Sequence, residues 1–183
     1  KLKNELSSNV NIQLKSSIID SSGNSIATTQ SNELLEAGSV KEISHNIELT
    51  NPEIWTIEKP YLYSVETEIF ENGKLIDNYT TPLGVRSFSF DPEKGFTLNG
   101  KATKIKGVCM HHDLGCLGAA VNRRAIERQL EILKEMGVNG LRTAHNPPAP
   151  ELLELCDRMG FIVMNETFDI WRKKMNEFDY SHH

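Results

Sequence analysis

The hydrophobic positions of residues 1–90 recur at every second residue, a pattern typical of β-strands with one buried face. The alternation is clearest at residues 10–18, 43–49 and 63–69. Residues 21–24 (SSGN) and 71–74 (ENGK) have turn composition, and the second predicts a β-hairpin because Asn and Gly tolerate positive φ. This part of the chain predicts an antiparallel β-sandwich, with Trp55 and Tyr63 as aromatic residues of its core.

A different pattern begins near residue 104, where three short apolar runs alternate with two segments of helical periodicity. The first segment has one apolar stripe at steps of four, three and three residues, formed by Ile126, Leu130, Leu133 and Met136. The second segment has an inner face formed by Leu152, Leu155, Cys156 and Met159. The pattern predicts strand, helix, strand, helix and strand, which is typical of parallel strands joined by right-handed crossovers.

Residues that favour helix ends stand at both ends of the two helical segments. Asn122 is suited to cap the first helix, and Gly137 is suited to the left-handed position just past its end. Pro150 is suited to the first turn of the second helix, which Gly160 would end.

Polar clusters follow each of the three apolar runs. Because loops at the carboxyl ends of parallel strands carry the ligand sites, we expect these clusters to lie on one rim of the sheet. The residues concerned are His111, His112, Asp113, Arg142, His145, Asn146, Glu166 and Asp169.

Each cluster also has a structural interpretation. One histidine after a strand can simply satisfy a backbone group, and an Arg–Glu combination can be an ion pair that holds a rim together. A metal site is disfavoured because adjacent residues such as His111 and His112 point to opposite sides of a strand. The coincidence of three clusters on one rim favours a substrate site.

Composition excludes several classes of function. The formal net charge of −5 and the lack of a basic patch argue against nucleic acid as a partner. No segment approaches the roughly 20 apolar residues of a membrane helix. The three cysteines have no Cys-x-x-Cys spacing, and we expect Cys109 and Cys156 to be small buried hydrophobic residues. Lys1 stands where a methionine would begin a natural protein, so we expect a longer parent.

Three segments resemble family 2 of the glycoside hydrolases, which includes β-galactosidases, β-glucuronidases and β-mannosidases. They are residues 96–101 (FTLNGK), 107–113 (GVCMHHD) and 123–169. The His-His-Asp sequence followed by residues 117–120 (LGAA) resembles a β-galactosidase-like subgroup. The resemblance implies an immunoglobulin-like β-sandwich over residues 1–90. The remainder, residues 91–183, would then be the first three βα units of a TIM barrel.

The resemblance also implies which residues this chain lacks. Retaining glycosidases use two carboxyl groups about 5–5.5 Å apart. In the family, the catalytic Asn-Glu pair closes the fourth strand and the nucleophile closes the seventh. Asn165-Glu166 would close the third strand, where the family usually has Asp-Glu in a supporting role. We therefore expect no catalytic residue in this chain, and an inactive chain in isolation.

The resemblance implies roles for five residues on the rim. Arg142 would keep the downstream nucleophile ionised, while His111 and His145 would bind sugar hydroxyls and Glu166 and Asp113 would order the rim. The chain departs from the family at Asn165 and at Cys109-Met110, where the family has Asn-Arg or Asn-Leu. The resemblance implies no cofactor, and nothing in this chain supports a divalent cation.

We therefore interpret the chain as part of a retaining exo-β-glycosidase, with β-galactosidase as the favoured activity and carbohydrate as the ligand. The alternatives are a β-glucuronidase or β-mannosidase of the same family, or a non-catalytic carbohydrate-binding or interaction module. Three barrel strands alone would leave an apolar face and two sheet edges uncovered, so we also expect the isolated chain to self-associate.

Overall fold

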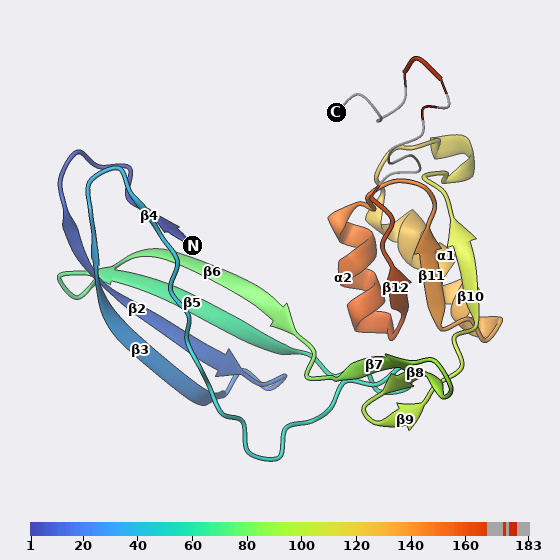
Figure 1. Cartoon of the computed structure of the whole chain (residues 1–183), viewed down its shortest axis with the longest axis horizontal. Coiled ribbons are helices and arrows are strands. Elements are labelled where there is room, and N and C mark those ends of the chain that lie inside the picture. Colours follow the sequence, from blue (N-terminus) through green and yellow to red (C-terminus); the bar gives the residue numbers. More distant parts are fainter. Residues whose placement is uncertain (168–173, 175, 179–183) are drawn as a thin grey trace. The chain divides into compact units, whose positions relative to one another are not determined.

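The computed structural model describes residues 1–167, 174 and 176–178, which form two compact units. The first, here called the sandwich unit, comprises Lys1–Ile54 and Leu62–Val85. The second, here called the barrel unit, comprises Trp55–Tyr61 and the chain from Arg86 onward. The predicted fold class, a β-sandwich followed by the start of a parallel α/β barrel, is confirmed (Figure 1).

The sandwich unit contains a four-stranded antiparallel sheet in the order β3-β2-β5-β6. Its strands are β2 (Val10–Ile19), β3 (Ser25–Leu35), β5 (Tyr63–Glu71) and β6 (Lys74–Leu83). A small antiparallel pair, β1 (Leu2–Lys3) with β4 (Val40–Lys41), accompanies it. The alternate residues Ile12 and Leu14 of β2 pack with Leu35 in the core. Burial of apolar surface on this one face stabilises the sheet.

The turns of the sandwich unit follow the sequence prediction, whereas one strand does not. Asn72 and Gly73 join β5 to β6 with φ of 49° and 77°, the positive values that a tight hairpin turn requires. Residues 42–50 were expected to contain a strand but form no ladder. Their side chains still alternate between half-buried and exposed. Alternation therefore reports one-sided burial here and not strand pairing.

The barrel unit contains three parallel strands in the order β10-β11-β12, which are β10 (Gly107–Met110), β11 (Gly140–Thr143) and β12 (Ile162–Met164). The crossovers contain α1 (Arg123–Glu135), preceded by the short helix η1 (Gly115–Leu117), and α2 (Pro150–Met159). Both helices cover the same face of the sheet, and their apolar residues meet the strands in one core. The buried members of this core are Ile126, Leu130, Val138, Leu141, Leu152, Leu155, Cys156 and Phe161.

The helix ends have the predicted caps. The Asn122 side chain accepts a hydrogen bond of 3.0 Å from the N–H of Ala125, and Pro150 occupies the first turn of α2. Gly137 and Gly160 adopt φ of 81° and 76°. The predicted apolar stripe is wrong at Met136, which lies past the last turn of α1 and is 70% exposed.

A small antiparallel sheet lies between the sandwich unit and β10 in the sequence. It consists of β7 (Phe88–Asp91), β8 (Gly95–Leu98) and β9 (Lys101–Ala102). Phe88, Phe90 and Phe96 form an aromatic cluster on it, with ring centroids 5.3–6.4 Å apart. Asn99 and Gly100 have positive φ and make the tight turn between β8 and β9.

Trp55 belongs to the barrel unit, so its prediction as a core residue of the sandwich is wrong. Its ring is 1% exposed, and its Nε1–H donates a hydrogen bond of 2.7 Å to the carbonyl of Asp157 in α2. The Arg86 guanidinium lies 4.4 Å from the ring centroid. Sequence could not show this because the partner is 102 residues away. Tyr63, in contrast, is buried in the sandwich unit as predicted.

Among the residues that the structure describes, no helix is long and apolar enough to cross a membrane.

Candidate functional site

Three polar side chains meet at the carboxyl ends of β11 and β12. Arg142 belongs to β11, His145 follows that strand, and Glu166 lies two residues past the end of β12. Arg142 Nη2 lies 3.1 Å from Glu166 Oε1 and 2.8 Å from Oε2. His145 Nδ1 lies 3.1 Å from the same Oε1. Residues 21 to 24 positions apart in sequence thus form one cluster, here called the rim cluster.

The contacts of His145 constrain its tautomer. Nδ1 lies within reach of both Glu166 Oε1 and Arg142 Nη2, at 3.1 and 3.3 Å. One ring nitrogen cannot donate to the carboxylate and accept from the guanidinium at once, and the carboxylate accepts more strongly. We therefore assign the proton to Nδ1, which leaves Nε2 as an acceptor in the neutral ring.

Glu166 is held as a carboxylate. Its pKa is lowered, first by the hydrogen bond from His145, then by the charge of Arg142, against the opposing effect of burial. Its backbone N–H donates a hydrogen bond of 3.0 Å to the Oγ1 of Thr143, a side chain in β11 that is 2% exposed. Buried Oε2 makes no hydrogen bond of good geometry to any described residue, although Arg142 lies close to it. Backbone and side chain are therefore both fixed.

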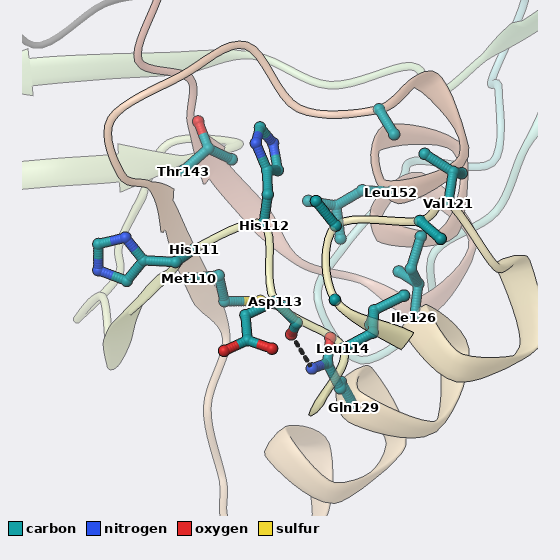
Figure 2. A pocket seen from close by; sticks show the side chains of 14 residues that line it. Met110, His111, His112, Asp113, Leu114, Val121, Ile126, Gln129, Thr143 and Leu152 are labelled. Atoms are coloured by element: carbon teal, nitrogen blue, oxygen red, sulfur yellow. Dashed lines mark hydrogen bonds between the residues drawn. The ribbon is translucent and has the colours of Figure 1, made fainter. Parts of the chain in front are cut away.

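The two histidines after β10 point to different places. The His111 ring lies against His145, with centroids 5.8 Å apart and planes at 75°. Figure 2 shows His112 directed away from His111, as expected of adjacent residues in extended backbone. His111 thus adjoins the rim cluster and His112 does not.

Asp113 is not part of the rim cluster. Its Oδ1 accepts a hydrogen bond of 2.7 Å from the N–H of Gly115. Its carbonyl accepts one of 3.0 Å from the side chain of Gln129 (Figure 2). These contacts order the loop between β10 and α1. Next to it lies a small cavity of about 50 Å³, lined mainly by apolar side chains.

Cys109 contacts the rim cluster, a feature that the sequence did not reveal. The thiol was expected to be buried, but the residue is exposed. Strand alternation is the reason, because its neighbours Val108 and Met110 pack on the helix-covered face. Arg142 Nη1 lies 3.5 Å from Cys109 Sγ. The pKa of Arg142 is raised, first by this sulfur and then by Glu166. Cys156, in contrast, is buried as expected, and burial raises the pKa of its thiol to about 12.

Asp169 was predicted to lie on the same rim, but it falls outside the described residues. Within the described ranges, no group of three or more His, Cys, Asp or Glu side chains is arranged to hold a metal ion.

The fold and the site together define a class. A guanidinium, an imidazole and a carboxylate at the carboxyl ends of parallel β/α strands, preceded by a β-sandwich, are typical of the first strands of a TIM-barrel domain that follows an accessory β-domain. Comparison with known families agrees. Residues 1–86 match the model of glycosyl hydrolases family 2, and residues 92–180 match its TIM barrel domain. The chain belongs to family 2 of the glycosyl hydrolases.

The relatives of this chain include both β-galactosidases and β-glucuronidases. The chain is similar to the β-galactosidase BoGH2A of Bacteroides ovatus, with 57% identity over 98% of this chain and 21% of that protein. It is similar to a β-glucuronidase of Bacteroides fragilis, with 39% identity over 64% of this chain and 17% of that protein. A family 2 structure from Bacteroides cellulosilyticus superimposes with a TM-score of 0.91 and 39% identity, covering 96% of this chain and 23% of that one. The chain thus spans about a fifth of these relatives.

Proposed function

We propose that this chain supplies the first substrate-facing part of a retaining exo-β-glycosidase, and that the sugar it helps to select is a β-linked galactose. The observation that carries the proposal is the rim cluster of Arg142, His145 and Glu166 in a chain of this family. Its position at the carboxyl ends of β11 and β12 is where barrel enzymes bind substrate.

The state of Glu166 defines its part in the proposal. A general acid must be protonated at the working pH, which requires a raised pKa. The pKa of Glu166 is instead lowered by His145 and Arg142. Glu166 therefore supports the site as a carboxylate and does not serve as the proton donor. This agrees with the positional argument that the catalytic carboxyl groups come from later strands.

The proposal gives the remaining residues distinct tasks. The Arg142 guanidinium keeps a nucleophilic carboxylate from a later strand ionised, as a cation beside a carboxylate does. His111 and the Nε2 of His145 are placed to bind sugar hydroxyls. Asp113, which was expected to help order the rim, orders the loop between β10 and α1 through its Oδ1, which accepts a hydrogen bond from the N–H of Gly115.

The choice of galactose as the sugar is supported by sequence identity to relatives of known activity. The identity of 57% to BoGH2A covers 98% of the chain, whereas that of 39% to the β-glucuronidase of Bacteroides fragilis covers 64%. A β-glucuronidase remains the runner-up because both activities occur among the relatives. A β-glucuronidase, unlike a β-galactosidase, must bind the carboxylate of its substrate, and this requires an additional cationic side chain.

The test is an assay of the longer protein that carries this chain against nitrophenyl β-glycosides. We expect the β-galactoside to be hydrolysed fastest, and chain 1–183 alone to give no turnover. Arg142→Gln should lower kcat by about 100-fold or more, the effect typical of losing one charge-stabilising donor. Arg123→Gln is the matched control, because Arg123 is an exposed arginine that pairs with Glu154 on the helix surface.

Other outcomes would contradict the proposal at different levels. A preference for β-glucuronide would replace galactose by the runner-up. No hydrolysis of any glycoside by the longer protein would favour a non-catalytic module. Hydrolysis by chain 1–183 that Glu166→Gln abolishes would show that Glu166 is catalytic.

A further inference from the structure

We propose that Cys109 is a positioning residue that holds the Arg142 guanidinium in the orientation required by the proposed glycosidase site, on which this inference rests. The side chain touches neither of the other members of the rim cluster. It acts through Arg142, as the strand register, the contacts of the guanidinium and the chemistry of the thiol indicate.

The first step is the register of the parallel sheet. Cys109 of β10 is paired directly with Arg142 of β11. Paired residues on neighbouring strands project from the same face of a sheet, so the thiol and the base of the arginine side chain are held side by side by the backbone. Their relation does not depend on a flexible loop.

The second step is the division of the guanidinium between two partners. Nη1 contacts Cys109 Sγ at 3.5 Å, whereas Nη2 contacts Glu166 at 2.8 and 3.1 Å. Among the described residues, the hydrogen-bond partner of Arg142 Nη1 is the Sγ of Cys109. A planar group held at one nitrogen can still swing about that contact. A second contact at the other nitrogen fixes its plane.

The third step is the chemistry of the position. A thiol sulfur is a weak, polarizable acceptor, whereas the amide oxygen of asparagine is a stronger one and can reach the same donor. Cys109→Asn therefore preserves an acceptor opposite Arg142, and Cys109→Ala removes it. These two variants separate an acceptor role from simple packing.

The decisive measurement has two arms. In the longer protein, Cys109→Ala should lower kcat by about three- to tenfold with KM changed less than twofold, because one hydrogen bond to a weak acceptor such as a thiol sulfur is worth about that factor. Cys109→Asn should stay within about threefold of the unchanged protein. Cys116→Ala is the control, since Cys116 is an exposed cysteine in η1 outside the rim cluster.

The second arm needs no activity. In chain 1–183, nitrogen-15 NMR should show separate Hη resonances for Arg142 at low temperature, which report a guanidinium whose rotation is restricted. We expect Cys109→Ala to merge them and Cys109→Asn to retain them.

The two arms distinguish the possible failures. If the longer protein hydrolyses no glycoside, the proposed function fails and the NMR arm still decides the role of Cys109. The inference is overturned if Cys109→Ala leaves both kcat and the Arg142 resonances unchanged. It is also overturned if the alanine and asparagine variants lose kcat equally, because that result indicates packing. If the alanine variant does not fold, Cys109→Ser, with a smaller acceptor, provides the intermediate case.

Discussion

The two sheets of this chain differ in how their faces are used. In the sandwich unit, one face of β2 supplies the core residues Ile12 and Leu14, and segments of the same unit cover them. In the barrel unit, α1 and α2 cover one face of the parallel sheet. The other face carries Cys109 and Arg142. Alternation thus serves stability in one sheet, and in the other it separates a stabilising face from a chemical one.

The first way to test this contrast is to disrupt the barrel unit alone. Gly160 ends α2 with φ of 76°, and a Cβ placed there would lie 2.2 Å from the Ile57 carbonyl oxygen. Gly160→Ala should therefore destabilise the barrel unit by about 3 kcal/mol or more, since strain at positive φ adds to an overlap with backbone. Hydrogen exchange should show lost protection in α2 and unchanged protection in β2 and β5.

A matched glycine sharpens the same experiment. Gly137 also follows a helix and has φ of 81°, but a Cβ there would meet no atom within 4 Å. Gly137→Ala should cost only about 1–2 kcal/mol, the price of the left-handed conformation. Equal losses from the two substitutions would show that the close approach of residues 55–61 to Gly160 contributes nothing.

The second prediction concerns the lysine that ties residues 55–61 to the barrel unit. Lys134 Nζ donates hydrogen bonds to the carbonyls of Ile57 at 2.9 Å, Met159 at 2.7 Å and Gly160 at 3.3 Å. Burial lowers the pKa of Lys134, so the cost of placing the ammonium there offsets part of the gain. We expect Lys134→Met to destabilise the barrel unit by about 1–2 kcal/mol in urea unfolding.

The control for this variant is Arg128→Met on the exposed side of the same helix. It should change the free energy of unfolding by less than about 0.5 kcal/mol. If Lys134→Met has an equally small effect, the three carbonyls must be satisfied by water once the ammonium is gone.

The third prediction, made from the sequence, is that chain 1–183 self-associates through the barrel unit. The order β10-β11-β12 places β10 and β12 at the edges, and Met164 and Phe90 are 63% and 71% exposed. Exposed apolar surface next to sheet edges drives association. Light scattering after size-exclusion chromatography should show a mass that rises with concentration.

A lysine introduced into each unit in turn shows which unit carries the surface that self-associates. Met164→Lys should shift the chain toward monomer, whereas Tyr79→Lys, at a 72% exposed aromatic residue of β6, should not. A monomer at every concentration would contradict the prediction. A mass lowered only by Tyr79→Lys would place the contact on the sandwich unit.

The success of sequence reasoning differed between local and distant features. Helix ends were predictable because Asn122, Pro150 and Gly160 act on their own backbone. Turns were predictable for the same reason, as Asn72 and Gly73 show. Residues 42–50 were misassigned because one-sided burial also occurs in unpaired extended chain. The position of Trp55 was missed because its partner Asp157 lies in another part of the sequence.

The site shows the same division. The order of strands and helices was sufficient to predict that Arg142, His145 and Glu166 share a rim, since the ends of parallel strands must meet. The same order did not show that Asp113 lies outside the rim cluster, because its carboxylate accepts a hydrogen bond from Gly115 in its own loop. It also could not show that Cys109 lies beside Arg142, because strand register is set by the neighbouring chains and not by local pattern.

The smallest expected effect concerns the charge state of Glu166. Titration of this carboxylate should affect the rim cluster and not the apolar cores. Its pKa is lowered in the folded chain, so the carboxylate contacts contribute stability above the ordinary pKa of 4.5 and lose it as pH falls through the folded pKa. Carbon-13 NMR of the side-chain carboxyl should therefore give a midpoint below 4.5, the ordinary value. The backbone fold should persist through this titration, because the sandwich and barrel cores are apolar.

Two variants sharpen this titration. The hydrogen bond from His145 is the largest cause of the lowered pKa, and the charge of Arg142 ranks after it. His145→Asn should therefore raise the midpoint more than Arg142→Gln does. A midpoint at or above 4.5 in the unchanged chain would mean that burial outweighs both partners. Glu166 would then hold its proton nearer to neutral pH, and the argument against it as a proton donor would rest on its position in the chain alone.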